Sequence, residues 1–390
     1  MPYYRRVGEV PPKRHTQFRS PSGDLYAEEL MGAEGFSSDS SLLYHRRPPT
    51  ALVGAEAVPP PADDLRPNEP LLPRHLRTGE LDGGGDLVLG RRLLLANDDV
   101  RLLVAAPTEP SGLYRNAAGD EVVYVRTGAL RLESSFGALE CRSGDYVVVP
   151  TGTTHRWLPV DGDPVNALVI EAHGHVGPPA RYLSPTGQFL EHSPYCERDL
   201  HAPDAPLLVE DDPGDGVEVL VRQRNGLTRY RYAHHPFDVV GWDGCLYPYR
   251  FSIHDFEPIT GRVHQPPPVH QTFAGPRFVV CSFVPRKLDY HPQAVPAPYN
   301  HANVDSDEVL FYCEGSYTSR KGAGIAPGSL TLHPGGFTHG PQPGSVEASL
   351  GAERTDELAV MVDTFAPLAL APAAHACEDA GYPWTWARGA

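Results

Sequence analysis

Two adjoining segments decide the fold of this chain: Pro298-Tyr-Asn-His-Ala-Asn-Val-Asp-Ser-Asp-Glu-Val-Leu-Phe-Tyr-Cys-Glu-Gly315 and Gly328-Ser-Leu-Thr-Leu-His-Pro-Gly-Gly-Phe-Thr-His-Gly-Pro341. The first contains a short apolar run at residues 309–312, and the second alternates polar and apolar side chains over residues 329–333. This pattern predicts a strand, a turn and a second strand. Inward-facing side chains of neighbouring strands in a small barrel can converge, even when they are far apart in the chain.

These segments also carry three candidate metal ligands, His301, Glu308 and His339. Two imidazoles and one carboxylate leave open positions on an octahedral ion, and this donor set is typical of non-haem Fe(II) oxygenases. Asp307 directly precedes Glu308 and is a rival for the carboxylate position. The sequence therefore predicts a metal site, with Fe(II) as the metal that suits it.

Four motifs carry a resemblance to known proteins. The second segment, with its His333-Pro-Gly-Gly-Phe-Thr-His339, resembles the second motif of the cupins. The other motifs are Leu246-Tyr-Pro-Tyr-Arg-Phe-Ser-Ile-His-Asp-Phe-Glu-Pro258, His264-Gln-Pro-Pro-Pro-Val-His270 and Tyr299-Asn-His301. Together they are similar to the homogentisate 1,2-dioxygenase family. Residues 23–32 match the family's opening segment and residues 361–368 its closing one, so the resemblance spans nearly the whole chain.

The resemblance implies a mainly β fold with two cupin-type jelly-roll barrels, a loop-rich N-terminal arm and few helices. It also implies an Fe(II)-dependent ring-cleaving dioxygenase that opens homogentisate to maleylacetoacetate, a step of tyrosine and phenylalanine breakdown. The expected partners are a small aromatic acid and O2. The family's assembly implies a homo-oligomer, a trimer or a hexamer.

The resemblance also assigns roles to single residues. His301, Glu308 and His339 would bind the iron, His270 would be the catalytic base, Tyr317 and His339 would contact the substrate, and His333 would lie beside the iron. Two departures from the family matter. The gap between His301 and Glu308 is one residue longer than usual, which keeps Asp307 open as a ligand, and the chain is shorter than typical members.

Three ranges are predicted along the chain: an N-terminal arm over 1–84, a degenerate cupin barrel with connecting strands over 85–245, and the catalytic barrel over 246–390. The predicted strands of the middle range are 87–89, 93–95, 100–104, 121–125, 129–133, 145–149 and 167–170. Glu121 and His155 stand where two metal ligands would be, but residues 116–119 replace the leading His pair. Two ligands are too few for tight binding, so we expect a structural barrel.

Composition excludes several classes of protein. The formal net charge of −16 argues against nucleic acid, because phosphate binding needs clustered Lys and Arg. The six cysteines form no Cys-x-x-Cys pair, which favours free thiols in a reducing compartment. No apolar signal core or membrane span is present, so a cytoplasmic protein is expected. The basic residues 45–47 are expected on the solvated surface.

The triple proline at residues 266–268 predicts a stiff extended loop that holds His270 over the metal, since proline fixes φ. For His254 and His264, structural hydrogen bonding and a role close to the metal site remain open. Two other functions also remain open. One is ring cleavage of another hydroquinone-like acid such as gentisate, and the other is a metal-binding cupin without oxygenase activity, either a small-acid binding protein or an isomerase.

Overall fold

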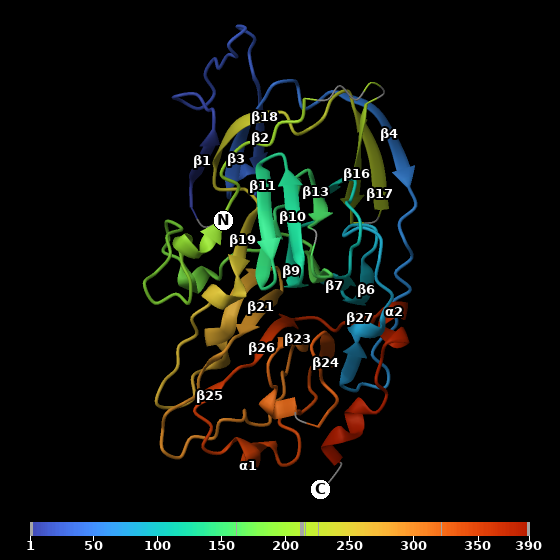
Figure 1. Ribbon diagram of the computed structural model, residues 1–390, viewed down its shortest axis with the longest axis vertical. Coiled ribbons are helices and arrows are strands. Elements are labelled where there is room, and N and C mark those ends of the chain that lie inside the picture. Colours follow the sequence, from blue (N-terminus) through green and yellow to red (C-terminus); the bar gives the residue numbers. More distant parts are fainter. Residues whose placement is uncertain are drawn as a thin grey trace.

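The computed structural model describes residues 3–160, 162–210, 214, 216–224, 226–320 and 322–387. The outer ends of the predicted arm and of the predicted catalytic range, residues 1, 2 and 388–390, lie outside this part of the chain. Strands dominate, and in Figure 1 most of the blue to green strands lie above most of the orange to red ones along the long axis. The mainly β fold class expected from the sequence is confirmed.

The upper barrel consists of two sheets. One has the order β11 (Gly137–Arg142), β10 (Ala129–Ser134), β13 (His155–Pro159), β8 (Leu113–Asn116), β16 (Val217–Gln223), β17 (Gly226–Tyr232) and β4 (Leu52–Val58). The other has the order β15 (Leu200–His201), β19 (Tyr249–Ser252), β12 (Asp145–Val149), β9 (Glu121–Thr127), β14 (Asn166–Ala172), β7 (Val100–Ala105), β6 (Arg92–Ala96) and β27 (Ala369–Leu370). Leu132 and Trp157 of the first sheet share a core with Val123 and Val147 of the second.

The lower sheet carries the residues of the predicted metal site. Together with the loops that connect its strands, it is called the lower barrel below. Its strand order is β20 (Gln271–Gly275), β21 (Phe278–Phe283), β26 (Leu358–Thr364), β23 (Asp307–Glu314), β24 (Ser329–His333) and β5 (Arg74–Arg77). The edge strand β5 belongs to the N-terminal arm and pairs with β24. Residues far apart in the chain therefore complete this sheet.

The lower sheet packs one face against the eight-stranded sheet of the upper barrel. Val309, Phe311 and Val360 share a core cluster with Tyr124 and Tyr146 of the upper barrel. The Tyr146 hydroxyl also lies 2.9 Å from the Ser282 hydroxyl across this contact. Because side chains alternate along a strand, the residues between these core positions point to the opposite face.

The remaining elements are short. The arm forms a sheet in the order β1 (Arg5–Gly8), β18 (Val239–Gly244), β3 (Ser40–His45) and β2 (Ala27–Gly32), and β22 (Arg286–Lys287) pairs with β25 (Arg354–Thr355). The α-helices are α1 (Ser345–Ser349) and α2 (Pro372–Ala376). The 3-10 turns are Glu34–Phe36, Thr78–Glu80, Ala180–Tyr182, Glu197–Asp199, Ile253–Asp255, Pro267–His270, Thr318–Arg320 and Tyr382–Ala387. Within the described ranges, every helix is too short or too polar to cross a bilayer.

Three expectations differ from the structure. Residues 87–89 form a turn and not a strand, because the Asp86 carboxylate accepts hydrogen bonds from the backbone N–H groups of Val88 and Leu89. The triple proline leads into a 3-10 turn instead of a fully extended loop. His45 is buried, not solvated, because it lies between the carboxylates of Asp238 and Glu29.

Sheet pairing also crosses the predicted range boundaries. β19 follows residue 246 in the chain but pairs with β12 of the upper barrel. In the opposite sense, β5 lies in the predicted arm but joins the lower sheet, while β27 lies in the predicted catalytic range but joins the upper barrel. The three ranges remain a prediction as domain limits.

Candidate metal centre

Strand alternation decides which of two neighbouring carboxylates faces the candidate site. Both are in β23, and successive side chains of a strand point to opposite faces. Asp307 turns away and accepts hydrogen bonds at 2.8 Å from the backbone N–H groups of Gly335 and Leu368. Glu308 points to the opposite face, toward three imidazoles.

Two loops bring His301 and His339 together. Their backbones form an isolated antiparallel bridge with both N–H···O distances at 2.8 Å, and their rings lie 4.3 Å apart. Gly340 permits this approach, because a Cβ at that position would lie 2.2 Å from the side-chain oxygen of Asn300. Any larger residue there would force the two histidine loops apart.

The two histidines present the same ring nitrogen to Glu308. The Nδ1 atoms of His301 and His339 each lie 3.1 Å from a backbone carbonyl oxygen two residues earlier in the chain. Their Nε2 atoms lie 3.5 and 3.2 Å from the Glu308 carboxylate. A second hydrogen bond of this kind fixes the tautomer and the ring orientation of a metal-binding histidine.

His333 contacts the same carboxylate, and hydrogen-bond contacts occupy both of its ring nitrogens. Its Nδ1 lies 2.9 Å from a Glu308 oxygen, and its Nε2 lies 3.0 Å from the Tyr382 hydroxyl. Its ring also stacks on His339, with centroids 4.2 Å apart and 16° between the planes. His333 is therefore placed to orient Glu308 and His339. Tyr382, near the C-terminus, had no local sequence signal.

Burial and charge act in opposite directions on these groups. Burial alone would raise the pKa of Glu308, but hydrogen bonds from His301, His333 and His339 outweigh it and hold that pKa well below its ordinary value. Burial lowers the pKa of His333 to about 3, so this ring is neutral near pH 7. The pKa of Asp363, the residue opposite Glu308 in β26, rises to about 8 through burial and then through the charge of Glu308.

The donor set fits a divalent metal ion. One ligand atom each from His301, Glu308 and His339 lies within 4.8 Å of the others. Neutral imidazole and carboxylate are good ligands for first-row transition metals, and three protein ligands on one side leave room for substrate. The structure thus brings together all three predicted ligands and places Asp307 outside the group.

The corresponding position in the upper barrel is filled by an arginine. Arg91 donates hydrogen bonds at 2.8 to 2.9 Å to both Glu121 oxygens and to Glu171. His155 is fully buried, and its Nδ1 lies 3.0 Å from the Thr153 carbonyl oxygen, the same arrangement as in His339. The guanidinium takes the place that a metal ion would have beside these carboxylates.

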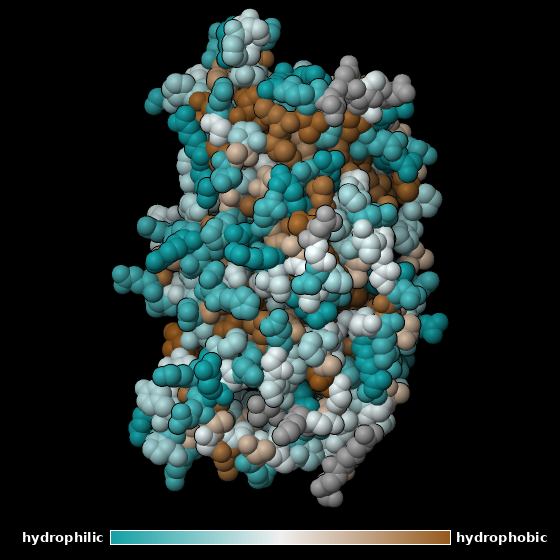
Figure 2. All heavy atoms as spheres, viewed as in Figure 1, coloured by the Kyte–Doolittle hydropathy of each residue, from teal (hydrophilic) through white to brown (hydrophobic). Residues whose placement is uncertain are grey.

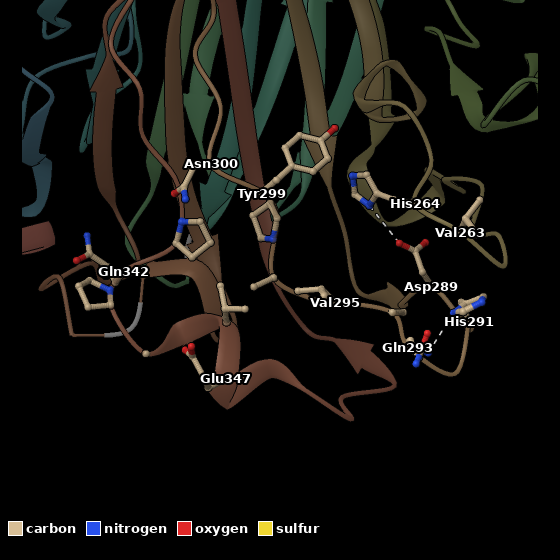
Figure 3. Close-up of a pocket in the computed structure, with 17 residues that line it drawn as sticks. Val263, His264, Asp289, His291, Gln293, Val295, Tyr299, Asn300, Gln342 and Glu347 are labelled. Atoms are coloured by element: carbon tan, nitrogen blue, oxygen red, sulfur yellow. Dashed lines mark hydrogen bonds and ion pairs between the residues drawn. The ribbon is translucent and has the colours of Figure 1, made fainter. Parts of the chain in front are cut away.

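A pocket of about 780 Å³ is lined by the loop that precedes His301, although none of the three candidate ligands lines it (Figure 3). Tyr299 and Asn300 line it, and the Tyr299 ring lies between the rings of His264 and His301, at centroid distances of 5.3 and 6.4 Å. His264 also lines the pocket, with its Nδ1 3.1 Å from the Asp289 carboxylate. Asp289 lacked a recognisable sequence signal.

The other two predicted site residues lie inside the lower barrel and do not line this pocket. His270 packs on Phe283 with ring centroids 4.6 Å apart, and its Nδ1 is buried without a hydrogen-bond partner among the described residues. Burial, then the charge of Arg286, lowers the pKa of His270 to about 3. Tyr317 packs on Tyr312, and its hydroxyl is likewise buried and unpartnered among those residues.

Two adjoining family models cover most of the chain. The model described as homogentisate 1,2-dioxygenase N-terminal matches residues 103–253, and the C-terminal model matches residues 253–388. The chain belongs to the homogentisate 1,2-dioxygenase family. Membership makes it a ring-cleaving dioxygenase, and it implies a metal cofactor, an aromatic substrate and O2.

Relatives of this homogentisate 1,2-dioxygenase family member cover nearly all of its length. A protein of Saccharolobus solfataricus named "Putative dioxygenase" is 40% identical over 99% of both chains. The homogentisate 1,2-dioxygenase of Emericella nidulans is 26% identical over 89% of this chain and 81% of its own. That of Rhodopseudomonas palustris is 26% identical over 86% of this chain and 78% of its own.

Proposed function

We propose that the protein is an Fe(II)-dependent dioxygenase that opens the aromatic ring of homogentisate to give maleylacetoacetate. The observation that carries the proposal is the convergence of His301, Glu308 and His339, with ligand atoms within 4.8 Å. Membership in the family supports homogentisate as the substrate. Bound Fe(II) would supply the redox chemistry that lets O2 react with the ring.

In this proposal His301, Glu308 and His339 hold the iron, and His333 orients Glu308 through the hydrogen bond at 2.9 Å. Tyr317 would donate a hydrogen bond to the substrate, which is supported by its buried hydroxyl that has no partner within the described part of the chain. His339 would contact the substrate from the metal side. The remaining group that the reaction needs is a base for the phenolic proton.

Two histidines compete for the role of base. His270 was the expectation from sequence, but a pKa of about 3 makes it a weak proton acceptor near pH 7. His264 lines the pocket next to Tyr299, and Asp289 at 3.1 Å favours a proton on Nδ1, which leaves Nε2 as the basic nitrogen. We therefore propose His264 as the base and keep His270 as the alternative.

Oxygen uptake tests the proposed function directly. Protein loaded with Fe(II) is expected to consume O2 when homogentisate is added, and to do so faster than with gentisate. Uptake with gentisate alone would assign a different ring acid. No uptake with either acid, at one metal ion per chain, would favour a binding protein or an isomerase.

Matched alanine variants identify the base. His264→Ala is expected to keep its iron and lose turnover by roughly 100-fold or more, the size of a general acid–base contribution. His270→Ala is expected to keep both its iron content and its turnover. The reverse pattern would restore His270 as the base, and loss of iron in either variant would make that histidine a ligand. Elemental analysis and oxygen consumption give the two readouts.

We also propose that the chain forms a homo-oligomer. β4 is an edge strand of the upper barrel, and its Leu52 and Val53 are 46% and 55% exposed. Figure 2 shows hydrophobic residues gathered at the upper end of the molecule, where β4, β16 and β17 lie. An unpaired strand edge with apolar side chains favours association. Sedimentation velocity would distinguish a trimer or hexamer from a monomer.

A further inference from the structure

The two barrels repeat the same arrangement of residues around their centres. Glu121 in β9 stands directly opposite Glu171 in β14, just as Glu308 in β23 stands opposite Asp363 in β26. His155 and His339 each follow the next strand by six residues, after Val149 and His333 respectively. Each barrel therefore holds a pair of facing carboxyl groups next to a histidine.

In the upper barrel a hydrogen-bond donor fills the space between the two carboxyl groups. Arg91 Nη1 donates to Glu121 at 2.9 Å and to Glu171 at 2.8 Å. Both carboxylates are nearly inaccessible to solvent. A buried carboxylate without a donor would be costly, so this bridging nitrogen satisfies both groups at once.

In the lower barrel no such donor reaches Asp363 from the described residues. Its Oδ1 is buried and has no hydrogen-bond partner among them. The buried guanidinium of Arg320 is engaged elsewhere, since it donates to the Gly340 carbonyl oxygen at 2.6 Å. The three imidazoles are directed at Glu308. Among the residues that the structure describes, none donates to the Asp363 side of the pair.

Apolar side chains lie beside Asp363 on its face of the sheet. Asp363 lies opposite Val279 in β21, and Phe283 is on the same face. All three residues are only partly buried although they face the interior. Leu310 and Met361 add apolar surface on the same face. The His270 ring packs on Phe283 at this wall, so an imidazole lies beside the apolar side chains and the Asp363 carboxyl group.

We propose that Asp363 forms a hydrogen bond with a ring hydroxyl group of the aromatic substrate and thereby selects hydroxylated rings. A phenol O–H can occupy the place that Arg91 Nη1 takes in the upper barrel, because it is a donor of similar reach. Unlike a guanidinium, it is neutral and does not repel a metal ion held by Glu308. This inference rests on the proposed function, since it assumes that the ring acid binds at the Glu308 site.

The test compares ligands with and without each hydroxyl group. Anaerobic titration calorimetry on Fe(II)-loaded protein measures the binding of 2,5-dihydroxyphenylacetate, the two monohydroxy analogues and phenylacetate. Asp363→Ala is expected to weaken binding of the dihydroxy acid by roughly 10- to 100-fold, because it leaves a buried ring hydroxyl group without a partner. For one monohydroxy analogue and for phenylacetate the change should be less than about threefold.

Two further variants keep the test decisive. Asp363→Asn retains the shape and a hydrogen-bonding oxygen, so it should bind more tightly than Asp363→Ala and reports on binding if the alanine variant does not fold. Asp305→Ala removes an exposed charge near the site and should change no affinity. Equal loss for all four ligands, or loss of iron from both Asp363 variants, would overturn the inference.

The outcomes separate this inference from the proposed function. If the wild-type protein binds the ring acids with the expected dependence on Asp363 but consumes no O2, the proposed reaction fails and the inference holds. If turnover is normal and Asp363→Asn and Asp363→Ala bind every ligand like the wild type, the inference fails and the reaction holds. Absence of any binding by the wild-type protein overturns both.

Discussion

At the scale of single residues, the opposite directions of Asp307 and Glu308 give a clear prediction. Glu308→Gln is expected to lose most of its metal, because the neutral amide is a poor ligand and three imidazoles surround it. Asp307→Asn is the matched control and should keep the metal. It should lose about 1–3 kcal/mol of stability, since an amide oxygen replaces a carboxylate that accepts two backbone N–H groups.

Metal content after gel filtration and thermal unfolding measure these two effects. A Glu308→Gln protein that holds one metal ion per chain, beside an Asp307→Asn protein that holds none, would transfer the ligand role to Asp307. Such a result would also require β23 to shift by one residue, which would turn all of its side chains to the other face.

Site residues were predictable where the chemistry is local in the chain. The choice of Glu308 follows from the period of two along one strand, and His339 lies in a short motif of glycine, proline and histidine. The position of His264 was not predictable, because it depends on Asp289, 25 residues away, and on the ring of Tyr299. Local spacing alone cannot choose between His264 and His270.

At the scale of the elements, Arg91 links strands β9 and β14 of the upper barrel through its ion pairs with Glu121 and Glu171. Arg91→Met should destabilise the protein by about 3–5 kcal/mol, because it leaves Glu121 and Glu171 buried without their cation. A divalent metal should then restore part of the loss, since the buried Nε2 of His155 has no partner among the described residues. Arg131→Met breaks one exposed and one partly buried ion pair but leaves Arg156 paired with Glu133, so it should cost about 0–1 kcal/mol.

Both arginine variants are best compared in the Glu308→Gln background, so that the lower site does not contribute to the metal response. Denaturant unfolding with and without Mn²⁺ gives the measurement. An Arg91→Met protein as stable as its parent, or one that responds to Mn²⁺ no more than its parent does, would contradict the role of Arg91 as a built-in cation.

His45 in β3 contacts Glu29 in β2 and Asp238 just before β18. Because these contacts depend on the charge of the imidazole, the stability of the arm sheet should depend on pH. Burial alone would lower its pKa, but hydrogen bonds to Asp238 and Glu29 raise it to about 9. An unfolded histidine titrates near 6.5, so the stabilisation is complete below about pH 6.5 and declines between pH 6.5 and 9. The stabilisation that protonated His45 provides is on the order of 3 kcal/mol.

The measurement is the difference in unfolding free energy between wild type and His45→Gln at several pH values. The difference should be largest near pH 6 and should shrink toward pH 9.5. A difference that stays constant over this range would mean that His45 stabilises the arm by packing and not by its charge.

Strands were predictable from alternation, but their partners were not. The expected strands at residues 121–125, 145–149 and 329–333 are present, because each carries its own pattern of apolar residues. The failure at residues 87–89 has a local cause, since the side chain of Asp86 caps a turn there. Neither segment alone carries a sequence signal that would predict the pairing of β5 with β24.

At the scale of the whole molecule, the shared core predicts one cooperative unfolding transition. The cluster that contains Phe311 and Val360 also contains Tyr124 and Tyr146, so the lower sheet shares its largest apolar core with the upper barrel. Residues 253–388 expressed alone should therefore aggregate or remain unfolded, because they expose that face and lack β5. Co-expression with residues 1–252 should restore a folded complex.

Circular dichroism and limited proteolysis of the separate halves measure this dependence. Two resolved calorimetric transitions in the full chain, or a folded and protease-resistant 253–388 fragment, would show that the lower barrel is an independent unit.

Strand β5, which the N-terminal arm contributes to the lower sheet, also sets the order of events during synthesis. His75 in β5 hydrogen-bonds to Ser329 in β24, 254 residues later. At about 5–20 residues per second, the ribosome needs roughly 10–50 s to make the partner of a strand that has already emerged. The nascent chain must keep β5 unpaired throughout that interval. The sheet that presents Glu308 can close only after β24 has been made, so metal loading cannot precede that point of synthesis, and the waiting arm is expected to need chaperones.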